Sequence, residues 1–165
     1  SRMGEHAKKE SRSLASSKNY QKQRKKTAFL HRKVQRQRKN YLHVLSKREV
    51  ENQDLIAAED LNVQNMKKNH KLAKAVSDAG WRTFLTMLQY KGALYGKTVV
   101  LVPPNYTTQT CSVCGYVMKG EEHLTLKPRE WECPNCHTIH HRDTNAAKNI
   151  LARGIALLKE QGLLL

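Results

Sequence analysis

Apolar and polar residues are arranged differently in successive parts of this chain, and the first arrangement is helical. From residue 20 to about 52 there is no glycine or proline, and lysine, arginine and glutamine, which are good helix formers, dominate. Leu30, Val34, Tyr41 and Leu45 recur at four- and seven-residue steps and form a narrow apolar stripe. The pattern predicts a long helix over residues 20–52, with one side docked on a core.

Two short apolar runs further along predict strands. Residues 55–58 form an uninterrupted apolar run typical of a buried strand, and residues 98–102 form a β-branched run that ends at two prolines. Because a helical pattern lies between them, within about 50 residues, the two strands should be parallel. That helix is predicted over residues 78–95, with an inward face of Trp81, Phe84, Leu85 and Leu88.

Single residues indicate where the other elements begin and end. Ser77 or Asp78 can cap the start of this helix, and Gly96 stands where a C-terminal glycine is favoured. The polar segment 64–74 is rich in lysine, asparagine and histidine and predicts a loop. A last helix beginning near Thr144 should return apolar side chains to the sheet, namely Ala147, Ile150, Leu151 and Leu158.

Positive charge is concentrated in the first part of the chain. Residues 1–48 hold 16 Lys and Arg against two acids, whereas residues 49–165 hold 14 against 12. A solvated helix usually carries acids and bases in similar number, so this imbalance favours a polyanion such as a nucleic acid as the partner. The predicted phosphate-contacting side chains on the helix are Lys25, Arg32, Arg36 and Arg38.

The apolar runs and the cysteine pattern of the sequence indicate the cellular compartment. There is no apolar run of 18 residues, and no apolar core follows the basic first residues, so we expect neither a transmembrane helix nor a secretory signal. A basic amphipathic stretch could lie on an anionic membrane, but residues 1–48 contain one phenylalanine and no tryptophan to anchor it. All four cysteines fit one metal-binding pattern, which indicates a reducing environment. We expect a cytoplasmic, nucleoid-associated protein without a membrane partner.

The cysteines form two Cys-x-x-Cys pairs separated by 18 residues. These pairs are Cys111 with Cys114 and Cys133 with Cys136, a spacing typical of zinc ribbons. Because four thiolates complete a tetrahedron and leave no open position, we interpret the site as structural zinc. Trp131 should pack on this ribbon, although base stacking by its ring is an alternative. The neighbouring histidines are interpreted as surface or phosphate-facing groups: His137, His140 and His141.

Two carboxylates are candidates for a second, catalytic metal site. Glu59 ends the first predicted strand, where open α/β sheets place active-site residues, and Asp143 opens the last helix. Carboxylate oxygens suit Mg²⁺ or Mn²⁺, and two such ions can activate water for phosphodiester hydrolysis. Plainer roles remain open: Asp143 as a helix N-cap, and Glu59 as a salt-bridge partner of the basic helix. Asp60 lies on the other face of the strand and is interpreted as structural.

At these residues the chain resembles the C-terminal half of the transposon-encoded OrfB/TnpB proteins. That family comprises RNA-guided DNA endonucleases related to the type V CRISPR effectors, and the resemblance runs from the basic helix to the end of the chain. Four stretches carry it in order: Ile56-Ala57-Ala58-Glu59-Asp60-Leu61-Asn62-Val63, Tyr90-Lys91 with Tyr95-Gly96-Lys97, Thr108-Gln109-Thr110-Cys111-Ser112-Val113-Cys114-Gly115 and Arg142-Asp143-Thr144-Asn145-Ala146-Ala147-Lys148-Asn149-Ile150.

The resemblance implies specific roles for these residues. The family's RuvC-like (RNase H-type) nuclease uses an Asp–Glu–Asp triad, in which Glu59 would be the middle acid and Asp143 the last. Arg142 and Asn145 match family positions near the reacting strand. The cysteine ribbon would lie in the insert that binds the target nucleic acid, and the partners would be a guide RNA and a target DNA.

The chain also departs from the family pattern. His137 and His141 stand where the family usually has glycine and aspartate. The family's first catalytic aspartate lies on a strand ahead of the basic helix, whereas the acids before Glu49 are Glu5 and Glu10, neither in an apolar strand. Removing one of three metal-binding carboxylates should cripple cleavage, unless an N-terminal portion or a second chain supplies it.

We therefore expect an α/β chain with a partial RuvC-like fold and an inserted four-cysteine zinc ribbon. The predicted parts are a flexible basic arm at 1–17, a nuclease domain at 18–105 and 141–165, and the ribbon at 106–140. The first hypothesis is the C-terminal part of an RNA-guided nuclease, inactive alone. The alternatives are a non-catalytic zinc-ribbon DNA- or RNA-binding regulator derived from that family, and a subunit of a larger ribonucleoprotein.

Overall fold

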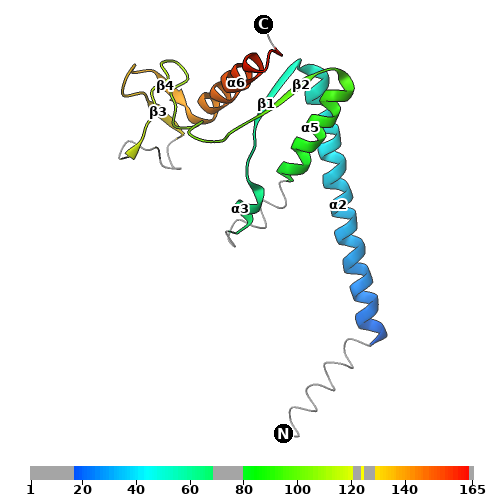
Figure 1. The fold of residues 1–165 in the computed structure, drawn as a ribbon. Coiled ribbons are helices and arrows are strands. Elements are labelled where there is room, and N and C mark those ends of the chain that lie inside the picture. The colour runs from blue at the N-terminus through cyan, green and yellow to red at the C-terminus, as the bar shows by residue number, and fades with distance from the viewer. Residues whose placement is uncertain (1–16, 69–79, 121–123, 125–128, 164–165) are drawn as a thin grey trace, which may run out of the picture. The chain divides into compact units, whose positions relative to one another are not determined.

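The computed structural model describes residues 17–68, 80–120, 124 and 129–163, and the predicted arm lies almost wholly outside them. The chain divides into two compact units, residues 1–44 and 45–165, which are described separately. Helix α2, Lys18–Asn52, runs through the division (Figure 1). Within the described residues, no helix combines the length and apolarity needed to cross a bilayer.

The part of α2 in the first unit is a solvent-exposed basic helix. Leu30, Val34 and Tyr41 are 59%, 44% and 65% exposed, so the predicted docking of this stripe on a core is wrong for residues 30–41. The stripe is narrow and flanked by lysine and arginine, which remain hydrated. The helix itself is confirmed, because residues with high helix propensity fill it without interruption.

The second unit is built around two parallel strands, as the sequence predicts. Strand β1, Leu55–Glu59, pairs with β2, Thr98–Val102, in a register that places Leu55 opposite Thr98 and Glu59 opposite Val102. Both strands therefore end at the same edge of the sheet, where Glu59 is the last residue of β1.

Helix α5, Trp81–Tyr95, connects the two strands and forms the crossover. It begins later than predicted, because Gly80 in a left-handed conformation is its N-cap, while Ser77 and Asp78 lie outside the described residues. Gly96, with φ of 65°, ends it as predicted, and its N–H donates to the Gly92 carbonyl.

The segment that follows β1 also differs from prediction. Residues 64–74 are predicted as a loop, but helix α3 spans Val63–Lys67 at its start. The Val63 N–H donates to the Leu61 carbonyl and the Met66 N–H to the Asn62 carbonyl, so local turns continue directly into one helical turn. The rest of that segment, apart from Lys68, lies outside the described residues.

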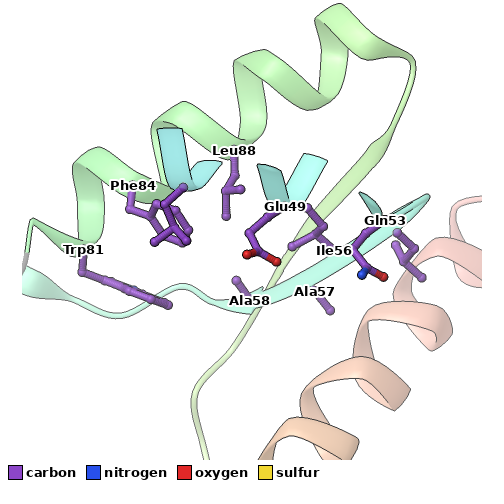
Figure 2. A pocket seen from close by; sticks show the side chains of 10 residues that line it. Glu49, Gln53, Ile56, Ala57, Ala58, Trp81, Phe84 and Leu88 are labelled. Atoms are coloured by element: carbon purple, nitrogen blue, oxygen red, sulfur yellow. The ribbon is translucent and has the colours of Figure 1, made fainter. Parts of the chain in front are cut away.

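Two layers of helix enclose the sheet. Val50 from the end of α2 packs with Ala58, Leu85 and Leu88 on one face, and Ile56, Trp81, Phe84, Val99 and Leu101 surround this cluster. Helix α6, Arg142–Glu160, covers the other face (Figure 2), beginning two residues earlier than predicted. A Cβ added to Gly154 would lie 2.9 Å from Ala57 Cβ, so glycine permits the close approach of helix and strand.

An apolar pocket of about 410 Å³ remains beside β1, on the face that carries this core. Figure 2 shows Ile56 and Ala58 on the same side of the strand as α5, with Ala57 directed toward α6. The pocket is lined by the end of α2, by β1 and by α5, with Leu45, Glu49, Gln53, Leu55, Ile56, Ala57, Ala58, Trp81, Phe84 and Leu88.

The cysteine segment forms a small second sheet between β2 and α6. Strand β3, Glu130–Glu132, pairs antiparallel with β4, Ile139–His141, and an isolated bridge joins Thr110 to Val117. Its core consists of Cys111, Met118, Trp131 and Cys133. The predicted packing of Trp131 on the ribbon is confirmed, since its side chain is 7% exposed.

Candidate metal centre and nucleic-acid interface

The four cysteine sulfurs converge on one point. Each Sγ lies within 4.8 Å of the others, with 3.6 Å between Cys111 and Cys136 and 3.6 Å between Cys114 and Cys133. A regular tetrahedron around Zn²⁺, with sulfurs at about 2.3 Å, has edges of about 3.8 Å. The cysteines therefore fit zinc as a closed structural site.

Both cysteine pairs close through the same backbone turn. The Gly115 N–H donates to the Cys111 carbonyl, and the His137 N–H donates to the Cys133 carbonyl, each at 2.9 Å. Both turns need a left-handed residue, so φ is 76° at Gly115 and 56° at His137. His137 is therefore a strained substitute for glycine, and its Nδ1 lies 2.9 Å from the Glu132 carboxylate at the surface.

The surroundings of the sulfurs differ sharply. Burial raises the pKa of the Cys111 thiol to about 11. A hydrogen bond from the Asn135 side chain lowers the pKa of Cys114 to about 6, and the Thr138 hydroxyl lowers that of Cys136. A bound divalent cation favours the thiolate at every position. The thiols of Cys114 and Cys136 are therefore more readily ionised than that of Cys111.

His140 is part of the metal centre's support rather than a surface group, which corrects the sequence interpretation. Its side chain is buried, its ring centroid is 4.7 Å from that of Trp131, and its Nε2 lies 3.1 Å from Cys111 Sγ. Burial lowers the pKa of His140, which favours the neutral ring. A neutral ring protonated at Nε2 donates its N–H to the sulfur.

Helix α6 holds the first cysteine pair through two buried asparagines. The Asn145 amide donates to the Thr110 carbonyl and accepts from the Ser112 N–H, at 2.8 and 2.9 Å. Asn149 donates to the carbonyls of Thr110 and Thr107. Asn145 is 1% exposed, so its side-chain amide is enclosed between α6 and the first cysteine turn.

Glu59 is connected to the same polar network. Its carboxylate is half-buried at the end of β1 and accepts a hydrogen bond from the Thr107 hydroxyl at 2.5 Å. The Thr107 carbonyl in turn accepts from Asn149, so the network extends from the sheet to α6. Asp60 lies outside this network and forms an exposed salt bridge with Arg82.

Asp143 lies in the first turn of α6 and is held by arginines. Its carboxylate oxygens lie 2.7 Å from an Arg129 nitrogen and 3.7 Å from Arg142 Nε, and its side chain is 57% exposed. The N-cap of α6 is His141, so the alternative that Asp143 serves as the N-cap is wrong. Within the described residues, the cysteines are the one group of three or more side chains placed to hold a metal.

Comparisons with known proteins agree with this architecture. Residues 1–70 match the OrfB_IS605 family model, described as "Probable transposase", and residues 81–150 match a model described as "Cas12f1-like, TNB domain". A Streptomyces pristinaespiralis protein named as an RNA-guided DNA endonuclease is 43% identical over 147 residues, 88% of this chain and 36% of that protein. The chain belongs to the OrfB/TnpB family.

Two further matches extend this result. The Escherichia coli K12 protein named as the RNA-guided DNA endonuclease InsQ is 34% identical over 90% of this chain and 40% of that protein. A chain in the cryo-electron microscopy structure of a Cas12f1–sgRNA–target DNA complex is 20% identical, with a TM-score of 0.56 over 90% of this chain and 41% of that one. The OrfB/TnpB-type chain thus spans about two-fifths of these relatives.

The basic residues predicted to contact phosphate in this TnpB-type chain all lie in α2. The side chains of Lys25, Arg32, Arg36 and Arg38 are exposed on α2. The sequence analysis missed other members of the site, because the spacing of residues along the chain shows neither their burial nor their hydrogen-bond partners. These are the supports that the structure identifies: Thr107, Arg129, His140 and Asn149. These residues lie within or next to the motifs that match the family, and this position in the sequence was the signal that could have identified them.

Proposed function

We propose that residues 1–165 form the C-terminal part of an RNA-guided DNA endonuclease with a RuvC-like active site, which binds a guide RNA and a target DNA. The observation that carries the proposal is the Glu59–Thr107–Asn149 network, which ties the end of a parallel strand to the helix bearing Asp143. Carboxyl ends of parallel strands are where α/β sheets place active sites. The names of the OrfB/TnpB relatives support the same reaction.

The carboxylates would take hard divalent cations. Mg²⁺ or Mn²⁺ bound by Glu59 and Asp143 would supply water activation and stabilise charge on the phosphodiester. The Thr107 hydroxyl orients Glu59 through its hydrogen bond. Arg129 and Arg142 neutralise Asp143 and can also pair with phosphate, since arginine suits bidentate phosphate contacts.

Cleavage by this mechanism needs a further carboxylate from outside these residues. Within the described residues this sheet consists of β1 and β2 alone, so each strand is paired along one edge only. A two-stranded parallel sheet is not an independently stable unit. We propose that a preceding portion or a second chain completes the sheet and supplies the missing acid, and that residues 1–165 alone do not cleave.

A chimaera tests the catalytic proposal. Residues 1–165 would replace the matching segment of the Streptomyces relative, and guide-directed DNA cleavage would be measured with Mg²⁺ and Mn²⁺. We expect cleavage that Glu59→Ala or Asp143→Ala abolishes, whereas the matched control Asp60→Ala retains it. A folded chimaera that binds nucleic acid without cutting, or that cuts despite either substitution, would contradict the proposal.

The binding part of the proposal has its own test. Exposed Lys25, Arg32, Arg36 and Arg38 release counterions on contacting phosphate, so affinity should fall steeply with salt, with a slope of about 0.7 to 0.9 per contact. Replacing all four with glutamine should flatten the slope. A control with the same charge change removes ion-paired bases instead: Lys47, Arg48, Arg82 and Lys97. Equal slopes for both variants would exclude the exposed side chains of Lys25, Arg32, Arg36 and Arg38 as the phosphate contacts.

One observation favours a second candidate, a non-catalytic regulator that binds DNA or RNA. Asp143 is already engaged by Arg129 and Arg142, as a purely structural acid would be. In this case the chimaera would bind its guide and target but would not cleave. The isolated chain would then still show the same salt dependence.

A further inference from the structure

A tyrosine between β2 and the first cysteine pair is held in an unfavourable conformation without being buried. Tyr106 has φ of 57° and is 51% exposed. For a residue with a Cβ the left-handed region costs free energy, and a half-exposed ring recovers little of it through packing. The fold alone therefore does not account for an aromatic side chain here.

The surrounding hydrogen bonds fix this loop firmly. The Tyr106 carbonyl accepts from the N–H groups of Gln109 and Thr110 at 3.1 and 3.0 Å, and from the Thr110 hydroxyl at 2.7 Å. The Arg153 guanidinium donates to the carbonyls of Pro103 and Asn105 just before it. The ring is thus presented on a rigid support, which lowers the entropy lost on binding.

A cation lies against this ring. Lys119 Nζ is 5.7 Å from the Tyr106 ring centroid, within the range of a cation–π contact, and the Lys119 side chain is exposed. The two residues are brought together by the hairpin that joins Thr110 to Val117 and by the Met118 N–H, which donates to the Gln109 carbonyl. An exposed aromatic face beside a positive charge is the pairing that binds a base and its phosphate.

The Tyr106 ring and the Lys119 side chain, together called the platform here, lie next to a candidate active-site group. Thr107 directly follows Tyr106, and its hydroxyl donates to the Glu59 carboxylate. We propose that the Tyr106 ring stacks on one unpaired base of a single-stranded nucleic acid while Lys119 contacts the adjoining phosphate. This rests on the proposed function, and it assigns the platform to leading a single strand toward Glu59.

The test uses the full chain and two single strands: a short oligothymidylate, and a strand of the same length made of abasic nucleotides. Tyr106→Leu keeps the Cβ and the backbone cost but removes the aromatic face, whereas Tyr106→Phe keeps that face. We expect Tyr106→Leu to weaken oligothymidylate binding about tenfold, and Tyr106→Phe to bind as the parent chain does. All three proteins should bind the abasic strand equally. Tyr95→Ala, in a similarly exposed tyrosine at the end of α5, is the control.

Other outcomes separate this inference from the proposed function. If the parent chain binds both strands and Tyr106→Leu binds oligothymidylate as tightly, base stacking at Tyr106 is wrong and the proposed function stands. If Tyr106→Leu weakens both strands equally, the ring is structural and the inference also fails. If the parent chain binds neither strand at low salt, both the proposed function and the base-stacking inference fail. Lys119→Ala should reduce the salt slope by about 0.7 if Lys119 contacts phosphate.

Discussion

The cysteine ribbon and the carboxylate end of the sheet differ in how complete they are. In the ribbon, four sulfurs from two pairs meet at tetrahedral distances, and His140 supports one of them. At the sheet, Glu59 is bonded to Thr107 while Asp143 is bonded to Arg129. The ribbon holds a full ligand set for a metal, whereas the proposed catalytic site at the sheet holds part of one. A closed structural metal site can be local to a short segment, whereas a nuclease centre draws its ligands from distant strands.

The largest expected effect is loss of the ribbon when one zinc ligand is removed. Cys133 is fully buried, and metal binding supplies most of the folding free energy of such small sites, on the order of 10 kcal/mol. Cys133→Ser, or removal of zinc by a chelator, should expose the amides of residues 106–140 to exchange while those of β1, β2 and α5 stay protected. Val113→Ser, in the same turn but 64% exposed, is the control and should change little.

The same experiment tests whether the ribbon and the sheet are stable independently of each other. Loss of protection in β1 and β2 after Cys133→Ser would mean that the sheet depends on the ribbon for its stability. An unchanged exchange pattern in residues 106–140 would instead mean that zinc does not hold the ribbon.

A smaller effect is expected where the two regions are joined. Asn149 is buried and donates to the carbonyls of Thr107 and Thr110, at 2.8 and 2.7 Å. Asn149→Ala removes both bonds. The Thr110 carbonyl keeps its bond from Asn145, whereas the buried Thr107 carbonyl loses the bond from Asn149, at a cost of about 1–3 kcal/mol. It should lower the free energy of unfolding measured in urea. Unlike Cys133→Ser, it should also increase amide exchange in β1 next to Glu59, because Thr107 is bonded to that carboxylate.

The neighbouring Lys148→Ala provides the control for this substitution, because Lys148 is exposed on the same helix. If Asn149→Ala affected the ribbon alone, the link from α6 to Glu59 would carry no energetic weight. The ribbon and the sheet would then be connected by the chain without stabilising each other.

The same contrast separates what the sequence could predict from what it could not. Local patterns were sufficient for the parallel strands, for α5 with its terminal Gly96, and for the cysteine site, because each depends on spacing within a short segment. The network around Glu59 was not predictable, since it joins Thr107 and Asn149 across 42 residues through buried hydrogen bonds.

Two errors have a common physical origin. The apolar stripe with Leu30 and Val34 was expected to be docked, yet those side chains are exposed. His140 was expected at the surface, yet it is buried against Trp131 and Cys111. In both cases burial depends on what packs against the residue, and residue type alone does not specify that neighbour.

The smallest effect is expected from backbone strain at one residue inside the cysteine ribbon. His137 occupies a left-handed turn that its partner turn fills with Gly115. His137→Gly should stabilise the ribbon by about 0.5–1 kcal/mol, since relief of backbone strain outweighs the added freedom of the unfolded chain. The Glu132 contact that is lost is exposed, with both side chains more than half accessible, and contributes little.

The matched substitution His137→Ala separates the two contributions. It removes the contact with Glu132 but keeps a Cβ in the left-handed region, so it should give no gain. The measurement is the chelator concentration at which residues 106–140 lose amide protection. A gain from alanine equal to that from glycine would place the strain in the side-chain contact rather than in the backbone. Gly115→Ala at the partner turn, where φ is 76°, should then be tolerated, whereas backbone strain predicts that it destabilises the ribbon.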